Sequence, residues 1–298
     1  MLAKEFVIRD ENKCKALITA DVTLYFNRLD GLASGITNAL NVVLPMLSPH
    51  VRWYRTESMS KDKKTTKQLF EAVISWFGDR FPEREEYGLV LTSGDTPEDV
   101  GPWGLTLSIE PDLMETETGY IQISLPIAEL KTPSKLFDLA VELANNLFFR
   151  SGHAGYSINY EEGEMNPWLD AQMRAWHNRY QALDARDLAS SGWQFCHSIK
   201  GVGWLTLLDL AFVEQLGGIE AIQKKLPLGV NVQQLDHGVI IQAGNKPLLG
   251  DKNRQEDLSD LRAVNDLISP IRIKDDIVIR AFGDIDGTKD WIERLDDK

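Results

Sequence analysis

Three strand-like segments follow one another in the first half of the chain with no helix between them. They are Glu86–Ser93, Trp103–Glu110 and Gly119–Pro126, each rich in β-branched or aromatic residues and bounded by turn residues. Parallel pairing needs a long crossover connection, usually a helix, so these strands are predicted to pair antiparallel. This run of strands is the strongest constraint on the fold.

Segments with helical periodicity surround these strands. Leu32–Leu47 carries apolar residues at intervals of three and four, which places them on one face of a helix. The same spacing predicts helices over Lys64–Phe77, Ser134–Phe149, Pro167–Tyr180, Leu205–Leu216, Ile219–Leu226, Arg254–Leu267 and Lys289–Leu295. Further strands are predicted over Ala16–Phe26, Val51–Glu57 and Ile277–Phe282, with a hairpin formed by Val230–Leu235 and Gly238–Gln242.

These patterns together predict an α+β protein with a mixed, largely antiparallel sheet packed with helices. The hydrophobic share of 43% supplies the apolar surface that a large core needs. No internal repeat, low-complexity tract or flexible linker interrupts the chain. Residues 1–298 are therefore predicted to form one unit, and a division into two lobes would fall near residues 130–150.

The charge of the chain excludes one class of function. Asp and Glu number 45 against 32 Lys and Arg, for a formal net charge of -13. Proteins that bind nucleic acid directly depend on clustered Lys and Arg, and this sequence has no such cluster. A basic partner is the natural complement of the acidic surface, although net negative charge also serves solubility alone.

The sequence also predicts where the protein resides. Cys14 and Cys196 lie far apart in unrelated contexts and are predicted to be reduced and buried. Residues 1–13 lack the apolar core and small-residue cleavage site of a secretory signal. No stretch approaches the ~20 apolar residues of a membrane helix. These features predict a soluble cytoplasmic protein without a membrane partner.

No catalytic template fits the sequence. The five histidines have neither zinc-ligand spacing nor a C-x-x-C partner motif, and each is predicted to be structural; they are His50, His153, His177, His197 and His237. Gly201-Val202-Gly203 begins like a dinucleotide fingerprint, but Thr206 stands where the third glycine belongs. The phosphate loop and the nucleophile elbow are also missing. We therefore predict no catalytic residues, no metal and no cofactor.

The acidic stretch near the C-terminus is the main alternative to this interpretation. Asp284, Asp286 and Asp290 superficially resemble a calcium loop, but the register of an EF-hand is wrong. We interpret the stretch as a turn with Asp290 near the N-terminus of the last helix, where the dipole favours a carboxylate. A metal-dependent hydrolase that uses these three aspartates is the competing hypothesis.

A glycine- and tyrosine-rich segment, Gly152–Glu164, is the most distinctive candidate surface. It is predicted to contain a short strand and an exposed loop. Tyrosines anchor protein interfaces because they combine apolar area with a hydrogen-bonding tip, although they can also belong to the core. The candidate partner-binding residues are Tyr156, Tyr160, Glu161, Glu162 and Glu164.

One segment carries a family resemblance. Lys200–Leu208, KGVGWLTLL, followed by Gln215-Leu216-Gly217-Gly218, resembles the K-G-x-x-W-L-T-x-L and L-G-G signature of the type VI secretion immunity protein family. Gly152–Tyr156 and Asp290–Leu295 also look like that family's pattern. The resemblance covers the second half of the chain by motif and the first half by the order of its elements.

The resemblance implies an antitoxin that binds a toxic effector and protects the cell that makes it. The acidic branch is similar to immunity proteins paired with VRR-Nuc-type nucleases, so the implied partner is a basic nuclease. Binding would occlude the DNA-binding or active-site surface of that effector without catalysis, cofactor or direct contact with nucleic acid. A chaperone that loads the effector is a further alternative.

Overall fold

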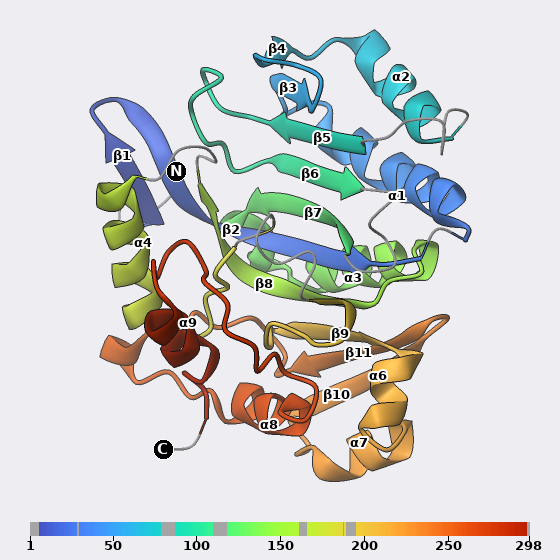
Figure 1. Ribbon diagram of the computed structural model, residues 1–298, viewed down its shortest axis with the longest axis vertical. Coiled ribbons are helices and arrows are strands. Elements are labelled where there is room, and N and C mark those ends of the chain that lie inside the picture. The colour runs from blue at the N-terminus through green and yellow to red at the C-terminus, as the bar shows by residue number, and fades with distance from the viewer. Residues whose placement is uncertain are drawn as a thin grey trace.

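One continuous antiparallel sheet forms the framework of the computed structural model, which describes residues 6–28, 30–78, 87–109, 118–160, 166–186, 188 and 195–296 (Figure 1). Within these residues, eleven strands lie in the order β10-β11-β9-β8-β2-β7-β6-β5-β3-β4, and β1 pairs with β2 off that path. All pairings between these strands are antiparallel. The predicted α+β class with a largely antiparallel sheet is confirmed.

The bounds of the elements are as follows. The strands are β1 (Val7–Asp10), β2 (Lys13–Phe26), β3 (Trp53–Thr56), β4 (Lys63–Lys64), β5 (Tyr87–Thr92), β6 (Gly104–Ile109), β7 (Gly119–Pro126), β8 (Ser151–Tyr160), β9 (Leu205–Asp209), β10 (Val230–Leu235) and β11 (Gly238–Ala243). The helices are α1 (Leu32–Leu47), α2 (Lys67–Gly78), α3 (Pro133–Asn146), α4 (Pro167–Arg179), α6 (Leu210–Gln215), α7 (Ile219–Lys225), α8 (Ser259–Ile268) and α9 (Ile285–Ile292), with short 3-10 helices η3 (Ile127–Lys131) and η5 (Lys252–Arg254).

Strand β2 lies at the centre of the sheet. It pairs with β7 over Thr19–Phe26 and with β8 over Ala16–Tyr25, while β1 occupies its remaining side near the start. Every residue from Ala16 to Phe26 is buried. A strand that is paired on both sides and covered on both faces favours β-branched and apolar residues, which is the composition seen here.

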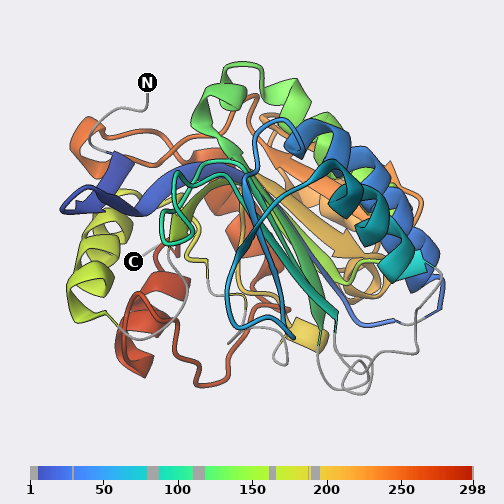
Figure 2. The ribbon, with the colours of Figure 1, turned by 90° about the horizontal axis from the view of Figure 1, so that it is seen from above.

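Helices α1, α2 and α3 cover one face of the sheet, as the blue, teal and green helices of Figure 2 show. The apolar stripe of α1 includes Ile36, Leu40 and Val43, which pack in one cluster with Val22 and Leu24 of β2. The helical spacing of apolar residues in α1 and their alternation in β2 thus allow the two apolar surfaces to bury each other.

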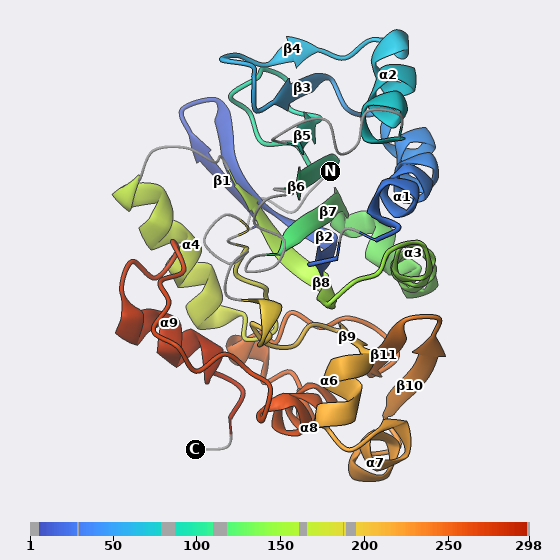
Figure 3. The ribbon, with the colours of Figure 1, turned by 45° about the vertical axis from the view of Figure 1, so that its right-hand side comes forward.

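The opposite face is covered by elements from the second half of the chain. Helix α4 and the C-terminal helix α9 lie beside each other on this side, across the sheet from α1 and α3 (Figure 3). Strands β9 and β11 extend the sheet toward β10, and α6, α7 and α8 pack around them in a third apolar cluster. None of the helices in the described part of the chain combines the length and the apolar character that crossing a membrane requires.

Several boundaries match the sequence predictions closely. Helix α1 and strand β7 begin and end at the predicted residues, and β10 and β11 form the predicted hairpin around Asp236 and His237. The predicted short strand in the segment Gly152–Glu164 belongs to the ten-residue strand β8, Ser151–Tyr160, in the middle of the sheet. Gly152 and Gly155 pair with β2, and the rest of the segment, residues 161–164, lies outside the described residues.

Three predicted elements are wrong. Leu205–Leu216 was assigned to one helix, but its first five residues form β9, and only Leu210–Gln215 is helical. A short apolar run fits a buried strand as well as a buried helix, and pairing with β8 and β11 decides between them. Ile277–Phe282 is not a strand, because its buried side chains pack in a loop against α4 and α9. The last helix spans Ile285–Ile292 instead of Lys289–Leu295.

The packing of α1 on the sheet predicts a large loss of stability on Leu40→Ala. Leu40 is fully buried, so its truncation leaves a cavity and should lower the free energy of unfolding by about 2–5 kcal/mol. Leu228→Ala is the matched control, since Leu228 is fully exposed and its loss should change stability by less than about 0.5 kcal/mol. Urea unfolding of both variants measures the difference, and equal midpoints would contradict the described packing.

Candidate functional site

A layer of buried polar side chains lies on the face of the central strands that points away from α1, α2 and α3. Thr19, Asp21 and Thr23 of β2 alternate with the apolar residues that face these helices, and Gln122 and Ser124 of β7 lie beside them. All five are between 0% and 3% exposed. Buried polar groups are stable only when they are hydrogen-bonded, so this polar layer calls for a specific network.

Asp21 is the centre of the polar layer. Its Oδ2 accepts hydrogen bonds from Gln122 Nε2 at 2.8 Å and from Ser124 Oγ at 3.0 Å. Among the described residues its Oδ1 has no hydrogen-bond partner, and neither has Gln122 Oε1. Burial raises the pKa of Asp21 to about 6, although hydrogen bonds from Thr19 and Ser124 and the charge of Arg186 act in the opposite direction. This carboxylate is therefore costly to ionise in the folded protein.

A buried ion-pair network lies next to this layer. Asp184 accepts from Lys200 Nζ at 2.7 Å and approaches His153 Nε2 at 3.1 Å, and Lys200 also donates to the backbone oxygen of Ala185 at 3.0 Å. Burial opposes the charged form of Asp184, but His153 and Lys200 outweigh it and hold the pKa of this carboxyl well below its ordinary value. The network joins β8 to the segments on either side of residues 187–194.

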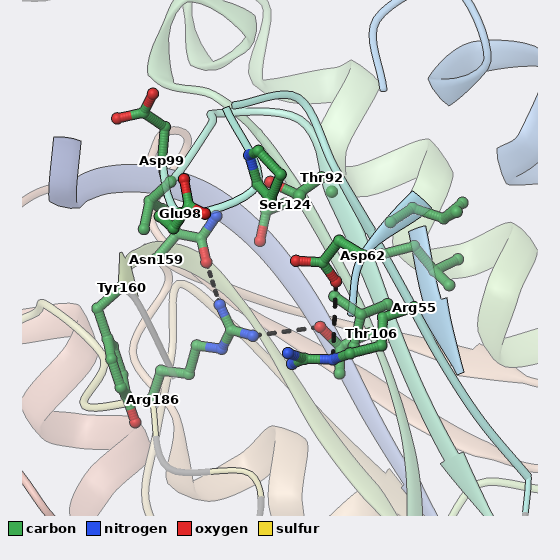
Figure 4. Close-up of a pocket in the computed structure, with 16 residues that line it drawn as sticks. Arg55, Asp62, Thr92, Glu98, Asp99, Thr106, Ser124, Asn159, Tyr160 and Arg186 are labelled. Atoms are coloured by element: carbon green, nitrogen blue, oxygen red, sulfur yellow. Dashed lines mark hydrogen bonds and ion pairs between the residues drawn. The ribbon is translucent and has the colours of Figure 1, made fainter. Parts of the chain in front are cut away.

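A cavity of about 210 Å³ opens beside the polar layer (Figure 4). Arg186 forms part of its wall, donating to Asn159 Oδ1 and, at 3.2 Å, to Thr106 Oγ1. Asn159 in turn donates to the backbone oxygen of Gly101 at 2.8 Å. The guanidinium of Arg186 lies 5.8 Å from the centre of the Tyr160 ring, which also lines the cavity. Side chains from β6, β8 and the segment after α4 thus meet here.

The loop Gly94–Val100 carries Asp95, Glu98 and Asp99, and its residues 97–100 line this cavity, so we call it the acidic rim. Asp99 anchors the loop, because its carboxylate accepts from the backbone N–H of Cys14 at 2.9 Å and from the backbone N–H and hydroxyl of Thr96 at 3.1 and 3.0 Å. Trp53 Nε1 donates to the Gly94 oxygen at 3.1 Å. Asp95 and Glu98 project outward from this anchored loop with side chains 86% and 55% exposed, and they form surface ion pairs with Arg52 and, at 3.9 Å, with Lys13. Figure 4 shows Glu98 and Asp99 on one side of the cavity and the Arg55 and Asp62 ion pair on the other.

The described residues present neither a metal-ligating cluster nor an activated Cys14 thiol. They contain no group of three or more His, Cys, Asp or Glu side chains placed to hold a metal ion. Burial raises the pKa of the Cys14 thiol to about 11, so this group is not a thiolate at neutral pH. Asp284, rather than the predicted Asp290, caps the last helix by accepting from the Gly287 N–H at 2.6 Å. Asp286 and Asp290, the other two carboxylates of the competing hydrolase hypothesis, are exposed on the same helix.

Comparison with known proteins places the chain in a family. A family model described as TsiV, type VI immunity for VRR-NUC, matches residues 36–295. This chain belongs to the TsiV family. Its structure is similar to that of the Pseudomonas aeruginosa T6SS protein PA0821, with a TM-score of 0.81 and 21% identity over 98% of this chain and 88% of that one. At this identity the likeness shows the shared fold. No curated protein matches the sequence.

The segment that suggested the TsiV family has a structural role. Lys200 belongs to the buried network around Asp184, and Trp204 is 5% exposed and donates from Nε1 to the Gly244 oxygen at 3.0 Å. A Cβ at Gly203 would lie 2.9 Å from the backbone oxygen of Ala154, so only glycine permits this close approach to β8. The signature therefore positions β9 against β8 inside the TsiV fold.

The structure describes two of the five predicted partner-binding residues. Tyr160 is 8% exposed and lines the cavity next to the acidic rim. Tyr156 is partly buried on the same strand and packs between two apolar clusters. Glu161, Glu162 and Glu164 lie outside the described residues. The role of these five residues in binding stays a prediction.

The sequence did not predict the roles of several residues of this site. Asp184 and Arg186 fall between predicted elements, where no periodicity distinguishes a buried charge from an exposed one, and Lys200 is recognised there only as the first residue of the family signature. Asp99 lies in a turn-rich segment between two predicted strands, where nothing in the sequence marks it as an anchor. The polar residues at alternate positions of β2 were a usable signal, since Thr19, Asp21 and Thr23 interrupt an otherwise apolar strand.

The raised pKa of Asp21 predicts a change in stability with pH that Asp21→Asn removes. An aspartate whose pKa rises on folding stabilises the fold fully below pH 3.8, and this contribution is lost as pH rises through about 6. The loss amounts to about 3 kcal/mol for a pKa change of this size. Asparagine keeps an acceptor for Gln122 and Ser124 and adds a donor where Oδ1 has no partner.

Urea unfolding at several pH values tests the predicted effect of Asp21→Asn on stability. The stability of Asp21→Asn relative to the unmodified protein should increase between pH 4 and pH 8. Asp138→Asn, which changes an exposed aspartate on α3, controls for the general loss of one negative charge. A difference between Asp21→Asn and the unmodified protein that does not vary with pH would contradict the raised pKa.

Proposed function

We propose that this TsiV-family chain binds a cognate VRR-Nuc effector and blocks the surface with which that nuclease binds or cleaves DNA. The observation that carries the proposal is the family match over residues 36–295. In this proposal the chain acts as a stoichiometric inhibitor, without catalysis, in the cytoplasm where the DNA of the producing cell lies.

The charge of the chain supports a nuclease as the partner. A surface that binds DNA presents Lys and Arg to the phosphates. A chain with a formal net charge of -13 attracts such a surface and speeds the encounter at low salt. Occlusion by this chain would therefore combine steric exclusion with charge complementarity.

The acidic rim is the proposed contact surface. Asp95 and Glu98 stand on a loop that Asp99 and Trp53 anchor through hydrogen bonds, so binding would not have to order this backbone. Tyr160 lies in the wall of the same cavity, and residues 161–164 follow it directly in the chain. The three glutamates of this segment, Glu161, Glu162 and Glu164, are also proposed to contact the effector.

Coexpression with the neighbouring effector gene tests the proposal. The effector should kill cells when it is expressed alone, whereas this chain should restore viability and copurify with the effector. Continued killing without a recovered complex would overturn the immunity role. Codelivery with the effector without protection of the producing cell would instead support the loading chaperone.

Charge reversal at the rim tests the contact surface separately. Asp95→Lys combined with Glu98→Lys should slow association with the effector about tenfold at low salt, because rim charges act mainly on the association rate. The difference should shrink as salt screens the charges. Glu214→Lys with Glu220→Lys, exposed on α6 and α7, is the matched control for net charge.

Surface plasmon resonance at 50 mM and 500 mM salt would measure these rates. An association rate that falls equally in the rim and control variants would show that net charge, rather than the rim, guides binding. If neither double variant changes the rate, electrostatic guidance by these residues is wrong, even where coexpression supports the immunity role.

A further inference from the structure

A second cavity, of about 680 Å³, lies in the C-terminal half and shares no lining residue with the first. Helices α4 and α9 form its sides, and α8 and η5 contribute further residues. Figure 3 shows α4 and α9 together on the left of the molecule, away from the strands β3 and β5 that border the first cavity. The second cavity therefore needs its own explanation.

The walls of this cavity are positively charged, in contrast to the acidic chain as a whole. Two carboxylates, Asp290 and Asp296, face four cations, and Asp296 is already engaged in a bidentate pair with Arg272 at 2.6 and 2.7 Å. The four cations are Arg174, Lys252, Arg262 and Arg294. Burial lowers the pKa of Arg294 to about 10, so it remains charged at neutral pH. The cavity thus has an excess of positive charge.

The guanidinium groups have N–H donors that the described contacts do not use. Arg174 donates to the backbone oxygens of Ala281 and Phe282, and Arg294 to those of Gln181 and Trp291. Each arginine carries five N–H donors, so these described contacts occupy only some of them. Lys252 has no ion-pair partner among the described residues, and its side chain is exposed. The donors exceed the acceptors around this cavity.

Two aromatic rings complete the lining of this cavity. His177 and Trp291 both line the cavity and are each 4% exposed. Within the described part of the chain, neither His177 Nδ1 nor Trp291 Nε1 has a hydrogen-bond partner. Burial, reinforced by Arg294, lowers the pKa of His177 to about 3, so this ring is neutral. Both nitrogens have almost no solvent-accessible surface, so the cations, rather than these rings, present the donors that a bound anion would reach.

We propose that this second cavity binds a small phosphorylated anion, with Arg174, Lys252, Arg262 and Arg294 as its cationic partners. Guanidinium groups favour phosphate because their planar N–H pairs match its oxygens. The volume is that of a site for a small molecule. The repulsion that a net charge of -13 exerts on a long polyanion disfavours a nucleic acid as the occupant. This binding site is separate from the proposed contact with the effector.

Isothermal titration of the full chain with pyrophosphate tests the site. Pyrophosphate should bind saturably with one site per chain, and Lys252→Glu and Arg262→Gln should each weaken it about tenfold, the effect of losing one charge-assisted hydrogen bond. Lys224→Glu changes an exposed lysine on α7 and is the matched control for charge. Comparison of pyrophosphate with ADP shows whether the ligand is inorganic or carries an organic group.

The Trp291 resonance and the affinity for citrate provide two further tests of the phosphate site. The indole N–H resonance of Trp291, assigned through Trp291→Phe, should shift on binding because the Trp291 side chain lines the cavity. Citrate should bind at least tenfold more weakly than pyrophosphate if the site recognises phosphate. Absence of saturable binding, equal weakening by Lys224→Glu, or equal affinity for citrate would overturn the proposal. None of these measurements uses the effector, so their failure would leave the immunity proposal unaffected.

Discussion

The pairing of β2 with strands on both of its sides is the constraint on which the rest of the structure depends. β7 and β8 come from positions about one hundred residues or more later in the sequence, yet they pair with β2 along most of its length. This pairing joins the run of strands in the first half to β9, β11 and β10 in the second half. A single sheet therefore links both halves, and each face of β2 determines what can pack against it.

The two faces of β2 serve different purposes. Val22 and Leu24 face helices and gain stability from apolar burial, whereas Asp21 on the other face is buried in a partly satisfied polar network. Buried charges cost free energy unless partners compensate them, as Lys200 and His153 do for Asp184. The polar face is thus less stable than an apolar one would be, but it places a polar cavity beside the anchored acidic rim.

Local patterns were reliable where one element buries one face against a single neighbour. The helix from Leu32 to Leu47 and the hairpin around Asp236 are recognisable because periodicity and turn residues agree. They were insufficient where a buried segment is short. The run Leu205–Leu208 is buried and pairs with β8 and β11, and its few residues show no period that distinguishes a strand from a helix. At the end of the chain, Ile277 and Ile279 are buried in a loop, where composition alone suggested a strand.

The sequence by itself determined the α+β class, the negative charge and, through the segment around Trp204, the immunity family. These properties depend on composition, on local periodicity and on a contiguous motif. Only the tertiary structure decided that Asp184 meets Lys200 and His153, that Asp99 anchors the acidic rim, and that four cations from α4, η5, α8 and the C-terminal segment surround one cavity. The partners in these clusters come from distant parts of the chain. Their electrostatic interactions depend on distance and burial in space, and neither quantity can be obtained from separation along the sequence.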